Sequence, residues 1–151
     1  MLDTTPNDRA KHKDLSQGLA SFYSNLSLSV LPQLKVLYSE DIVFIDPVGI
    51  HKGLSSLTHY FQRLLVNCSQ CRSLISSLFI DSDGGYIQWS MTFAHPRLNN
   101  GNELEINGIS VLKIKDNKIT YQRDFYDMGA MIYEHLPVIG TIIKFLRKRM
   151  A

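Results

Sequence analysis

The sequence has few of the residues that build disulfides and metal sites. Among its 151 residues there are two cysteines, Cys68 and Cys71, and five histidines. A CxxC spacing is typical of redox pairs, but such pairs lie at the start of a helix, and these cysteines follow an expected helix. A zinc site would require a second Cys/His pair at ligand spacing, which the sequence lacks. We therefore expect free thiols and no bound metal.

Several catalytic motifs are also missing. The sequence contains no HExxH, no glycine-rich phosphate loop and no GxSxG. These motifs carry zinc, nucleotide-phosphate and covalent-serine chemistry, respectively. All three chemistries are disfavoured, and we expect no cofactor.

Neither a large net charge nor a long apolar run is present. The formal net charge is +2, which is too small to favour a nucleic-acid partner. No segment reaches the ~18 apolar residues of a membrane span, and the polar stretch MLDTTPNDRAKHKD lacks the apolar run of a signal peptide. We expect a cytoplasmic protein that binds no nucleic acid.

The hydrophobic residues that are present follow two different periods. They make up 44% of the chain, which suits one globular domain. In the first half, helical spacing predicts helices over 15–26, 30–38 and 54–67. Between them, Ile42–Asp46 is a predicted strand, because Pro47 cannot continue a strand and Gly49 permits a turn.

The second half has a period of two. It predicts strands over 72–81, 85–95, 103–115 and 118–126, separated by the turn sequences DSDGG, RLNNGN and KDNK. We therefore predict an α+β fold, in which a curved antiparallel sheet wraps around three N-terminal helices. The predicted parts are a flexible N-terminus (1–13), one domain (14–136) and an amphipathic basic helix (137–151).

A curved sheet that is unevenly covered by helices leaves an apolar pocket at one end, and such pockets carry a few polar groups. Alternation places Trp89, Met91 and Phe93 on one face of their strand, together with His95. On the next strand, Ser110 is the polar residue of an otherwise apolar face.

Asp46 follows Phe44 on the inner face of the first strand, so it can lie at the rim of this pocket. Burial beside apolar side chains would raise its pKa and make it a proton acceptor near neutral pH. The alternative is structural, since aspartate before proline commonly starts a turn by accepting bonds from backbone N–H groups.

The order of these elements resembles the nuclear transport factor 2-like superfamily, and more closely its SnoaL-like members. The likeness covers about residues 14–130 and includes the stretches IDPVG, HKG, LSSLTHYFQRLL and DFYD. It implies the cone-shaped fold, whereas the activity stays open because this superfamily hosts many reactions as well as binding and transport proteins.

Ketosteroid isomerase is the member that this chain resembles most locally. Its general base falls on Asp46, and its oxyanion-hole tyrosine falls on Tyr23 or, one place off, on Phe22. Its second oxyanion donor, a protonated aspartate, falls on Ser110, which is a weaker donor. Steroid isomerisation itself is therefore disfavoured, and the resemblance implies proton transfer on a small apolar carbonyl compound such as a polyketide-, terpenoid- or steroid-like molecule, by an isomerase, cyclase or hydrolase type of reaction.

The last strand is open to two interpretations. Apolar content favours Tyr121, Arg123 and Phe125 as the inner set, whereas the resemblance places Asp124 and Tyr126 at the pocket. In the second case Asp46 and Asp124 form an acid–base pair; in the first, Arg123 and Asp124 form surface ion pairs.

His51, in the loop after Asp46, is either a pocket residue or a solvated loop histidine. We thus predict catalytic roles for one group of residues: Asp46, Tyr23, Ser110 and Asp124. We predict a ligand-binding wall from a second group: Phe44, His51, Trp89, Met91, Phe93, His95 and Tyr126. Binding of a lipophilic ligand without turnover, or a protein-interaction domain, are the alternative functions.

Two further surfaces suggest partners. Ile109 and Val111 lie on the outer face of their strand, which favours a homodimer through the sheet. The tail PVIGTIIKFLRKRM is apolar and basic, so it either contacts an anionic membrane surface or packs on the domain or a dimer partner.

Overall fold

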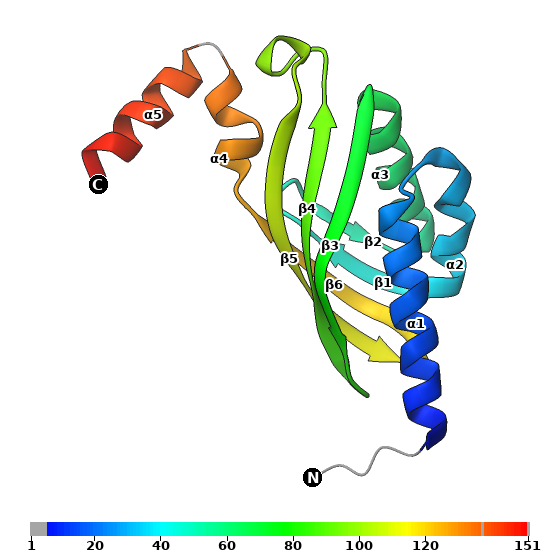
Figure 1. The fold of residues 1–151 in the computed structure, drawn as a ribbon. Coiled ribbons are helices and arrows are strands. Elements are labelled where there is room, and N and C mark those ends of the chain that lie inside the picture. Colours follow the sequence, from blue (N-terminus) through cyan, green and yellow to red (C-terminus); the bar gives the residue numbers. More distant parts are fainter. Residues whose placement is uncertain (1–5, 137, 151) are drawn as a thin grey trace.

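The computed structural model describes residues 6–136 and 138–150. Its first three helices precede its four longest strands, and together they form the predicted α+β cone (Figure 1). Helix α1 spans Pro6–Ser24, so residues 6–13, which we expected to be a flexible N-terminus, are helical. Residues 1–5 lie outside the described residues, as do Pro137 and Ala151.

The segment predicted as a second helix is shorter and tighter than expected. It consists of a 3-10 helix η1 (Leu28–Gln33) and one turn of α-helix, α2 (Leu34–Leu37). Pro32 lies within η1, and because proline has no backbone N–H it disfavours a continuous α-helix there. The third helix, α3 (Leu54–Asn67), has the predicted bounds.

The sheet has six strands in the order β2-β1-β6-β5-β4-β3. Their bounds are β1 Tyr38–Ile45, β2 Ile50–Lys52, β3 Gln70–Ile80, β4 Gly84–Ala94, β5 Leu104–Lys115 and β6 Lys118–Tyr126. The prediction of a purely antiparallel sheet is wrong, because β1 pairs with β6 in parallel. Short turns imply antiparallel neighbours only for strands that are consecutive, and β1 and β6 are far apart in the chain.

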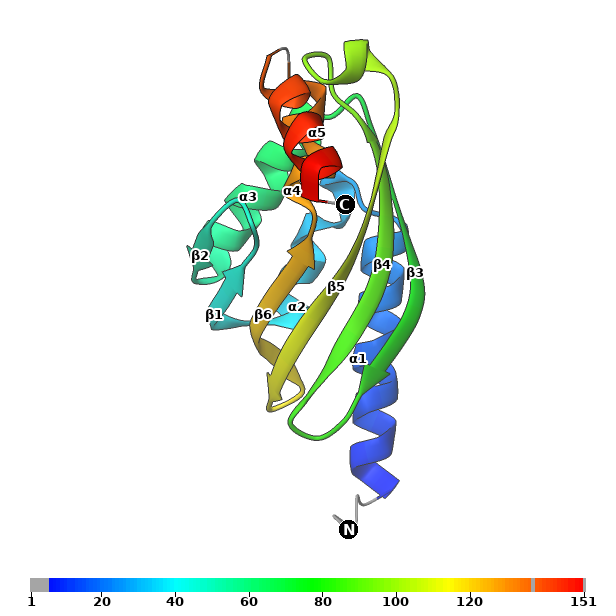
Figure 2. The same ribbon diagram turned by 90° about the vertical axis from the view of Figure 1, so that its left-hand side faces the viewer.

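Helices α1, α2 and α3 lie on one side of the curved sheet (Figures 1 and 2). The core between these layers contains Phe22 from α1, Phe61 from α3 and Phe44 from β1, and the rings of Phe22 and Phe44 both pack edge-on against Phe61. Strand β1 packs against α3 and pairs with β6. These contacts fix the turn that follows β1 at the rim of the core. Asp46 is the first residue of that turn.

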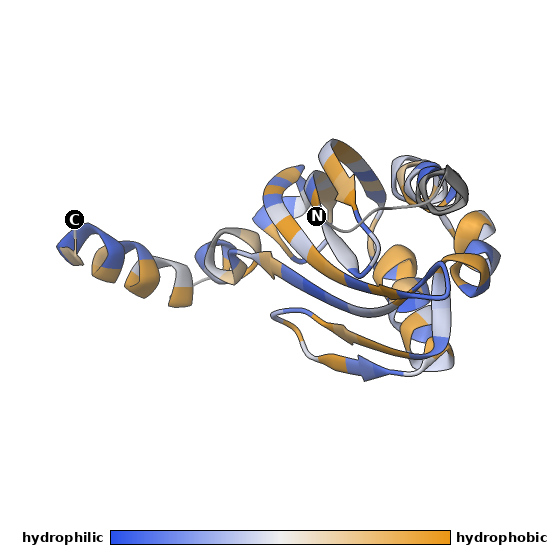
Figure 3. Cartoon of the chain, turned by 90° about the horizontal axis from the view of Figure 1, so that it is seen from below, coloured by the Kyte–Doolittle hydropathy of each residue, from blue (hydrophilic) through white to orange (hydrophobic). Residues whose placement is uncertain are grey.

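The chain after β6 forms two helical pieces. The first comprises α4 (Met128–Met131) and the 3-10 helix η3 (Tyr133–His135), and the second is α5 (Ile139–Met150). Helix α5 extends away from the sheet and has one apolar and one polar side (Figure 3). Its apolar side chains are exposed: Ile139, Ile142, Phe145, Leu146 and Met150. These side chains are not buried against their own chain, which leaves a membrane surface or a dimer partner as the alternatives for the tail.

Candidate functional site

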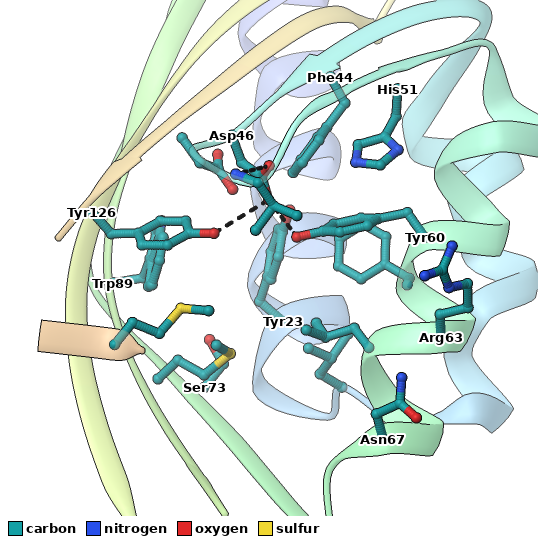
Figure 4. A pocket seen from close by; sticks show the side chains of 17 residues that line it. Tyr23, Phe44, Asp46, His51, Tyr60, Arg63, Asn67, Ser73, Trp89 and Tyr126 are labelled. Atoms are coloured by element: carbon teal, nitrogen blue, oxygen red, sulfur yellow. Dashed lines mark hydrogen bonds between the residues drawn. The ribbon is translucent and has the colours of Figure 1, made fainter. Parts of the chain in front are cut away.

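A pocket of about 280 Å³ opens between α3 and the inner face of the sheet (Figure 4). Its wall combines apolar side chains, among them Phe44, Trp89 and Met91, with the two carboxyl groups of Asp46 and Asp124. This volume lies near the lower end of the ~300–1,000 Å³ that small-molecule sites usually have. The pocket therefore suits a small, mainly apolar ligand that meets a few polar groups.

Asp46 is buried, with 7% of its surface exposed, and its carboxylate accepts four hydrogen bonds. Oδ1 accepts from the backbone N–H groups of Val48 and Gly49, both at 2.9 Å. Oδ2 accepts from the hydroxyls of Tyr60, in a short bond, and of Tyr126, at 3.4 Å. The turn role and the pocket role are thus combined in one residue: one oxygen stabilises the turn and the other faces the ligand site.

Tyr60 and Tyr126 approach Asp46 from opposite walls of the pocket (Figure 4). Burial, followed by the negative charge of Asp46, raises the pKa of both phenols. Both hydroxyls are therefore protonated donors at neutral pH. The long bond from Tyr126 is the weaker of the two. The Tyr126 hydroxyl can therefore leave Asp46 more easily and donate its hydrogen bond to a ligand oxygen instead.

Asp124 also lines the pocket, which resolves the two interpretations of β6 in favour of the face with Gln122 and Tyr126. Enclosure by protein raises the pKa of Asp124 from 3.8 to about 6, with a further contribution from the charge of Asp46. Hydrogen bonds from Ser110 and Gln122 act in the opposite direction and lower this pKa. A carboxyl group with a pKa near 6 can both accept and return a proton at neutral pH.

Gln122 is fully buried behind Asp124 and connects it to two tyrosines. Its Nε2 donates to Asp124 Oδ1 at 2.9 Å and to the Tyr23 hydroxyl at 3.1 Å, and its Oε1 accepts from the Tyr38 hydroxyl at 2.8 Å. Since Tyr38 gives its proton to Gln122, the 2.9 Å bond between the two tyrosines is donated by Tyr23. Tyr23 therefore lines the pocket while its own proton is engaged in a closed ring of hydrogen bonds.

Ser110 lies behind Asp124 and is not part of the pocket wall. Only 1% of its surface is exposed, its Oγ accepts a 2.9 Å bond from Nε1 of Trp89, and its hydroxyl bonds to Asp124. Gly108, opposite Trp89 on β5, makes this possible, because a Cβ there would lie 2.3 Å from the indole ring. Ser110 thus orients a carboxylate, in place of the direct contact with an oxyanion that the resemblance implied.

His51 belongs to the pocket wall and comes from β2, the short strand that periodicity did not predict. Its ring stacks on Tyr60 with centroids 4.1 Å apart. Its Nε2 is buried and has no hydrogen-bond partner among the described residues.

Phe93 and His95 line a neighbouring chamber instead of the main pocket. The alternation of β4 correctly placed Phe93 on the inner face, and His95 follows directly after the strand. The strand is long, and its end extends past the first pocket. Tyr60 and Gln122 are the main polar residues of the site that the sequence did not suggest. In the sequence, Tyr60 fits the apolar face of its helix, so nothing indicates a polar role for its hydroxyl. Gln122 lies on a strand and belongs to no recognised sequence motif.

Metal ligands are scarce in the part of the chain that the structure describes. It contains no cluster of three or more His, Cys, Asp or Glu side chains able to hold a metal ion. Cys68 and Cys71 are free thiols, and burial raises the pKa of both. No helix among the described residues is long and apolar enough to cross a membrane.

Comparison with known families and structures gives a consistent picture. The family model described as the SnoaL-like domain matches residues 20–122. A search of curated proteins gave no match.

Among solved structures, the chain is similar to a proposed SnoaL-like polyketide cyclase from Jannaschia sp. CCS1, with a TM-score of 0.71 and 12% identity over 87% of this chain and 94% of that one. It is also similar to a hypothetical protein with a ketosteroid isomerase-like fold from Catenulispora acidiphila DSM 44928, in complex with trimethylamine (TM-score 0.67, 14% identity, 87% and 93% covered). A third similar structure is an LEH-like epoxide hydrolase from M. tuberculosis (TM-score 0.65, 14% identity, 80% and 88% covered). Identities this low show a shared fold alone.

Proposed function

Because the chain belongs to the SnoaL-like domain family, we propose that it carries out cofactor-independent acid–base chemistry on a small apolar carbonyl compound. The observation that carries this proposal is the position of Asp124. Its carboxyl group lines an apolar pocket, is oriented from behind by Gln122, and has a pKa of about 6.

In the proposed reaction, the carboxylate of Asp124 takes a proton from the carbon next to the carbonyl group. The electron pair of the broken C–H bond forms an enolate, whose charge develops on the carbonyl oxygen. The Tyr126 hydroxyl, released from its 3.4 Å bond to Asp46, donates to that oxygen. In an isomerase-type reaction on a β,γ-unsaturated compound, the enolate is conjugated with the C=C bond, and Asp124 returns the proton to the far carbon of that bond. In a cyclase-type reaction the enolate carbon attacks a second carbonyl group, and Asp124 returns the proton to the alkoxide that forms.

Asp46 has a supporting part in this scheme. All four of its hydrogen bonds are donated to it, so it is a fixed acceptor that positions Tyr60 and Tyr126. It also raises the pKa of Asp124 by charge repulsion. From the sequence we expected Asp46 to be the base and Asp124 to be its partner. The proposal keeps this pair of carboxylates and exchanges their roles.

The alternative is a binding module that holds a lipophilic ligand without turnover. The observation in its favour is that the hydroxyl proton of Tyr23 and the oxygens of Asp46 are already engaged within the protein. Such a module needs the apolar wall but does not need the charge of Asp124.

Hydrogen–deuterium exchange separates the two functions without knowledge of the natural substrate. We expect the protein to accelerate exchange of the α-protons of 2-tetralone or 2-nonanone in D2O, followed by NMR. Asp124→Asn should reduce the acceleration by about 10²-fold or more, the usual contribution of a general base, while ligand affinity changes little. Tyr126→Phe should slow exchange more than Tyr60→Phe, which is its matched control. Binding of these ketones with no Asp124-dependent exchange would favour the binding module.

A further inference from the structure

A second chamber of about 290 Å³ lies directly beside the pocket. The two share part of their walls, namely Leu64 and Asn67 of α3, Met91 of β4 and Met131 of α4. Lining residues shared from three different elements show that the two chambers adjoin each other. Together the two adjoining hollows offer a ligand more room than the first pocket alone.

The two chambers differ in chemistry. The first carries the two carboxyl groups and the tyrosine hydroxyls, whereas the second is lined mostly by apolar and sulfur-containing side chains, including Phe93, Leu98, Ile132 and Cys68. Phe93 and Leu98 belong to a separate buried cluster of the core. A ligand that fills both chambers would therefore have one polar end and one apolar end.

Methionines stand where the chambers meet. Met91 and Met131 contribute to both walls and approach from the sheet and from α4, respectively. Methionine is unbranched and changes rotamer easily. These two side chains can adapt to a hydrocarbon chain that passes from one chamber into the other.

We propose that the chambers form one channel, and that its ligand is a carbonyl compound with an apolar chain of several carbons. The carbonyl group lies beside Asp124 and Tyr126, and the chain passes Met91 and Met131 to end near Cys68. The position of the carbonyl group rests on the proposed function. The occupation of the second chamber by a chain is a separate claim and is tested separately.

Two cysteines provide the test in the intact protein. Cys68 lines the second chamber, whereas Cys71 lines neither chamber and serves as the internal control. Both thiols are alkylated with N-ethylmaleimide and followed by mass spectrometry, with and without 2-nonanone or the short ketone 2-butanone. At ten times its Kd, 2-nonanone should slow alkylation of Cys68 by about tenfold and leave Cys71 unchanged, whereas 2-butanone at the same multiple of its Kd should protect neither.

Affinity along the 2-alkanone series gives a second readout. Each methylene that enters the second chamber should lower the Kd by about fourfold. Ile132→Trp, which fills the chamber, should remove this dependence on chain length. Ile142→Trp, the same change on the exposed face of α5, should retain it.

The outcomes distinguish this proposal from the proposed function. Protection of Cys68 without α-proton exchange supports the channel and removes the proposed reaction. Exchange that depends on Asp124, with Cys68 unprotected and affinity independent of chain length, overturns the channel and leaves the reaction standing. Protection that persists in Asp124→Asn supports the channel as a binding site independent of the base.

Discussion

The side-chain amide of Gln122 donates a 2.9 Å hydrogen bond to Oδ1 of Asp124, two residues further along β6. Residues i and i+2 of a strand share one face, so Gln122 lies behind Asp124 and points its amide along the strand. The same amide completes the ring of bonds with Tyr23 and Tyr38. A fully buried side chain thus orients a pocket carboxylate and lowers its pKa against the larger, raising effect of burial.

Gln122→Leu should therefore change the pH profile of α-proton exchange. The hydrogen bond from Gln122 lowers the pKa of Asp124, so its loss should move the midpoint of exchange to higher pH. Tyr23 and Tyr38 also lose a partner, and the free energy of unfolding should fall by about 1–3 kcal/mol. Gln88→Leu, an exposed change on β4, is the control. An unchanged midpoint would show that Gln122 does not act on Asp124.

Asp124→Asn should stabilise the protein at neutral pH while abolishing its activity. The folded state binds the Asp124 proton more tightly than the unfolded state does, because the pKa rises from 3.8 to about 6 on folding. Stability from this group is thus fully present below pH ~4 and is lost as pH rises through about 6. Above that pH the ionised group costs up to about 3 kcal/mol, which the amide avoids.

Thermal unfolding at two pH values checks this prediction. The Tm of Asp124→Asn should exceed that of the wild-type protein at pH 8, and the difference should shrink or vanish at pH 4. Asp41→Asn, the same change at an exposed aspartate of β1, is the matched control. A destabilised Asp124→Asn protein at pH 8 would mean that the carboxylate is held by stronger favourable contacts than its burial suggests.

Helical and strand periods predicted the fold well, because they report directly on which face of an element is buried. The parallel pairing of β1 with β6 escaped prediction, since it joins segments that no turn connects. Strand β2, Ile50–Lys52, is too short to show a period. In the site, alternation along β4 and the resemblance of the DFYD stretch led to Trp89 and Asp124. The hydroxyl of Tyr60 and the amide of Gln122 could not be assigned, because their partners are distant in sequence.

A homodimer through the outer face of the sheet remains a prediction. Exposed apolar side chains gather on that face: Phe79, Tyr86, Ile109, Val111 and Phe125. Contiguous apolar surface of this kind commonly marks an interface. Sedimentation at micromolar concentration should show a dimer of the 17.2 kDa chain, and Val111→Lys should shift it to a monomer by burying a charge. A wild-type monomer would remove the dimer.

Helix α5 offers an apolar side together with Lys144, Lys148 and Arg149, and we propose that it binds an anionic membrane surface. Each basic residue near such a surface contributes about 1 kcal/mol. Arg147 instead pairs with Asp127 at 3.1 Å and with Glu134, and these partly exposed ion pairs contribute little to stability. Deleting residues 138–151 should leave the Tm nearly unchanged and abolish binding to phosphatidylserine vesicles.

Neutral phosphatidylcholine vesicles are the control for charge, and we expect weak binding to them by the intact protein. A large fall in Tm on deletion, with no vesicle binding by the intact protein, would instead assign α5 to an interface between two copies of the chain.

The most direct test of the proposed chemistry requires no substrate. The carboxyl carbon of Asp124 is followed by 13C NMR as a function of pH, with Asp124→Asn used to assign its resonance. A base that works near neutral pH should titrate with a midpoint of about 6, as its enclosure and the charge of Asp46 dictate. A midpoint below ~4, the value of an ordinary aspartate, would contradict the assignment of Asp124 as the group that moves the proton.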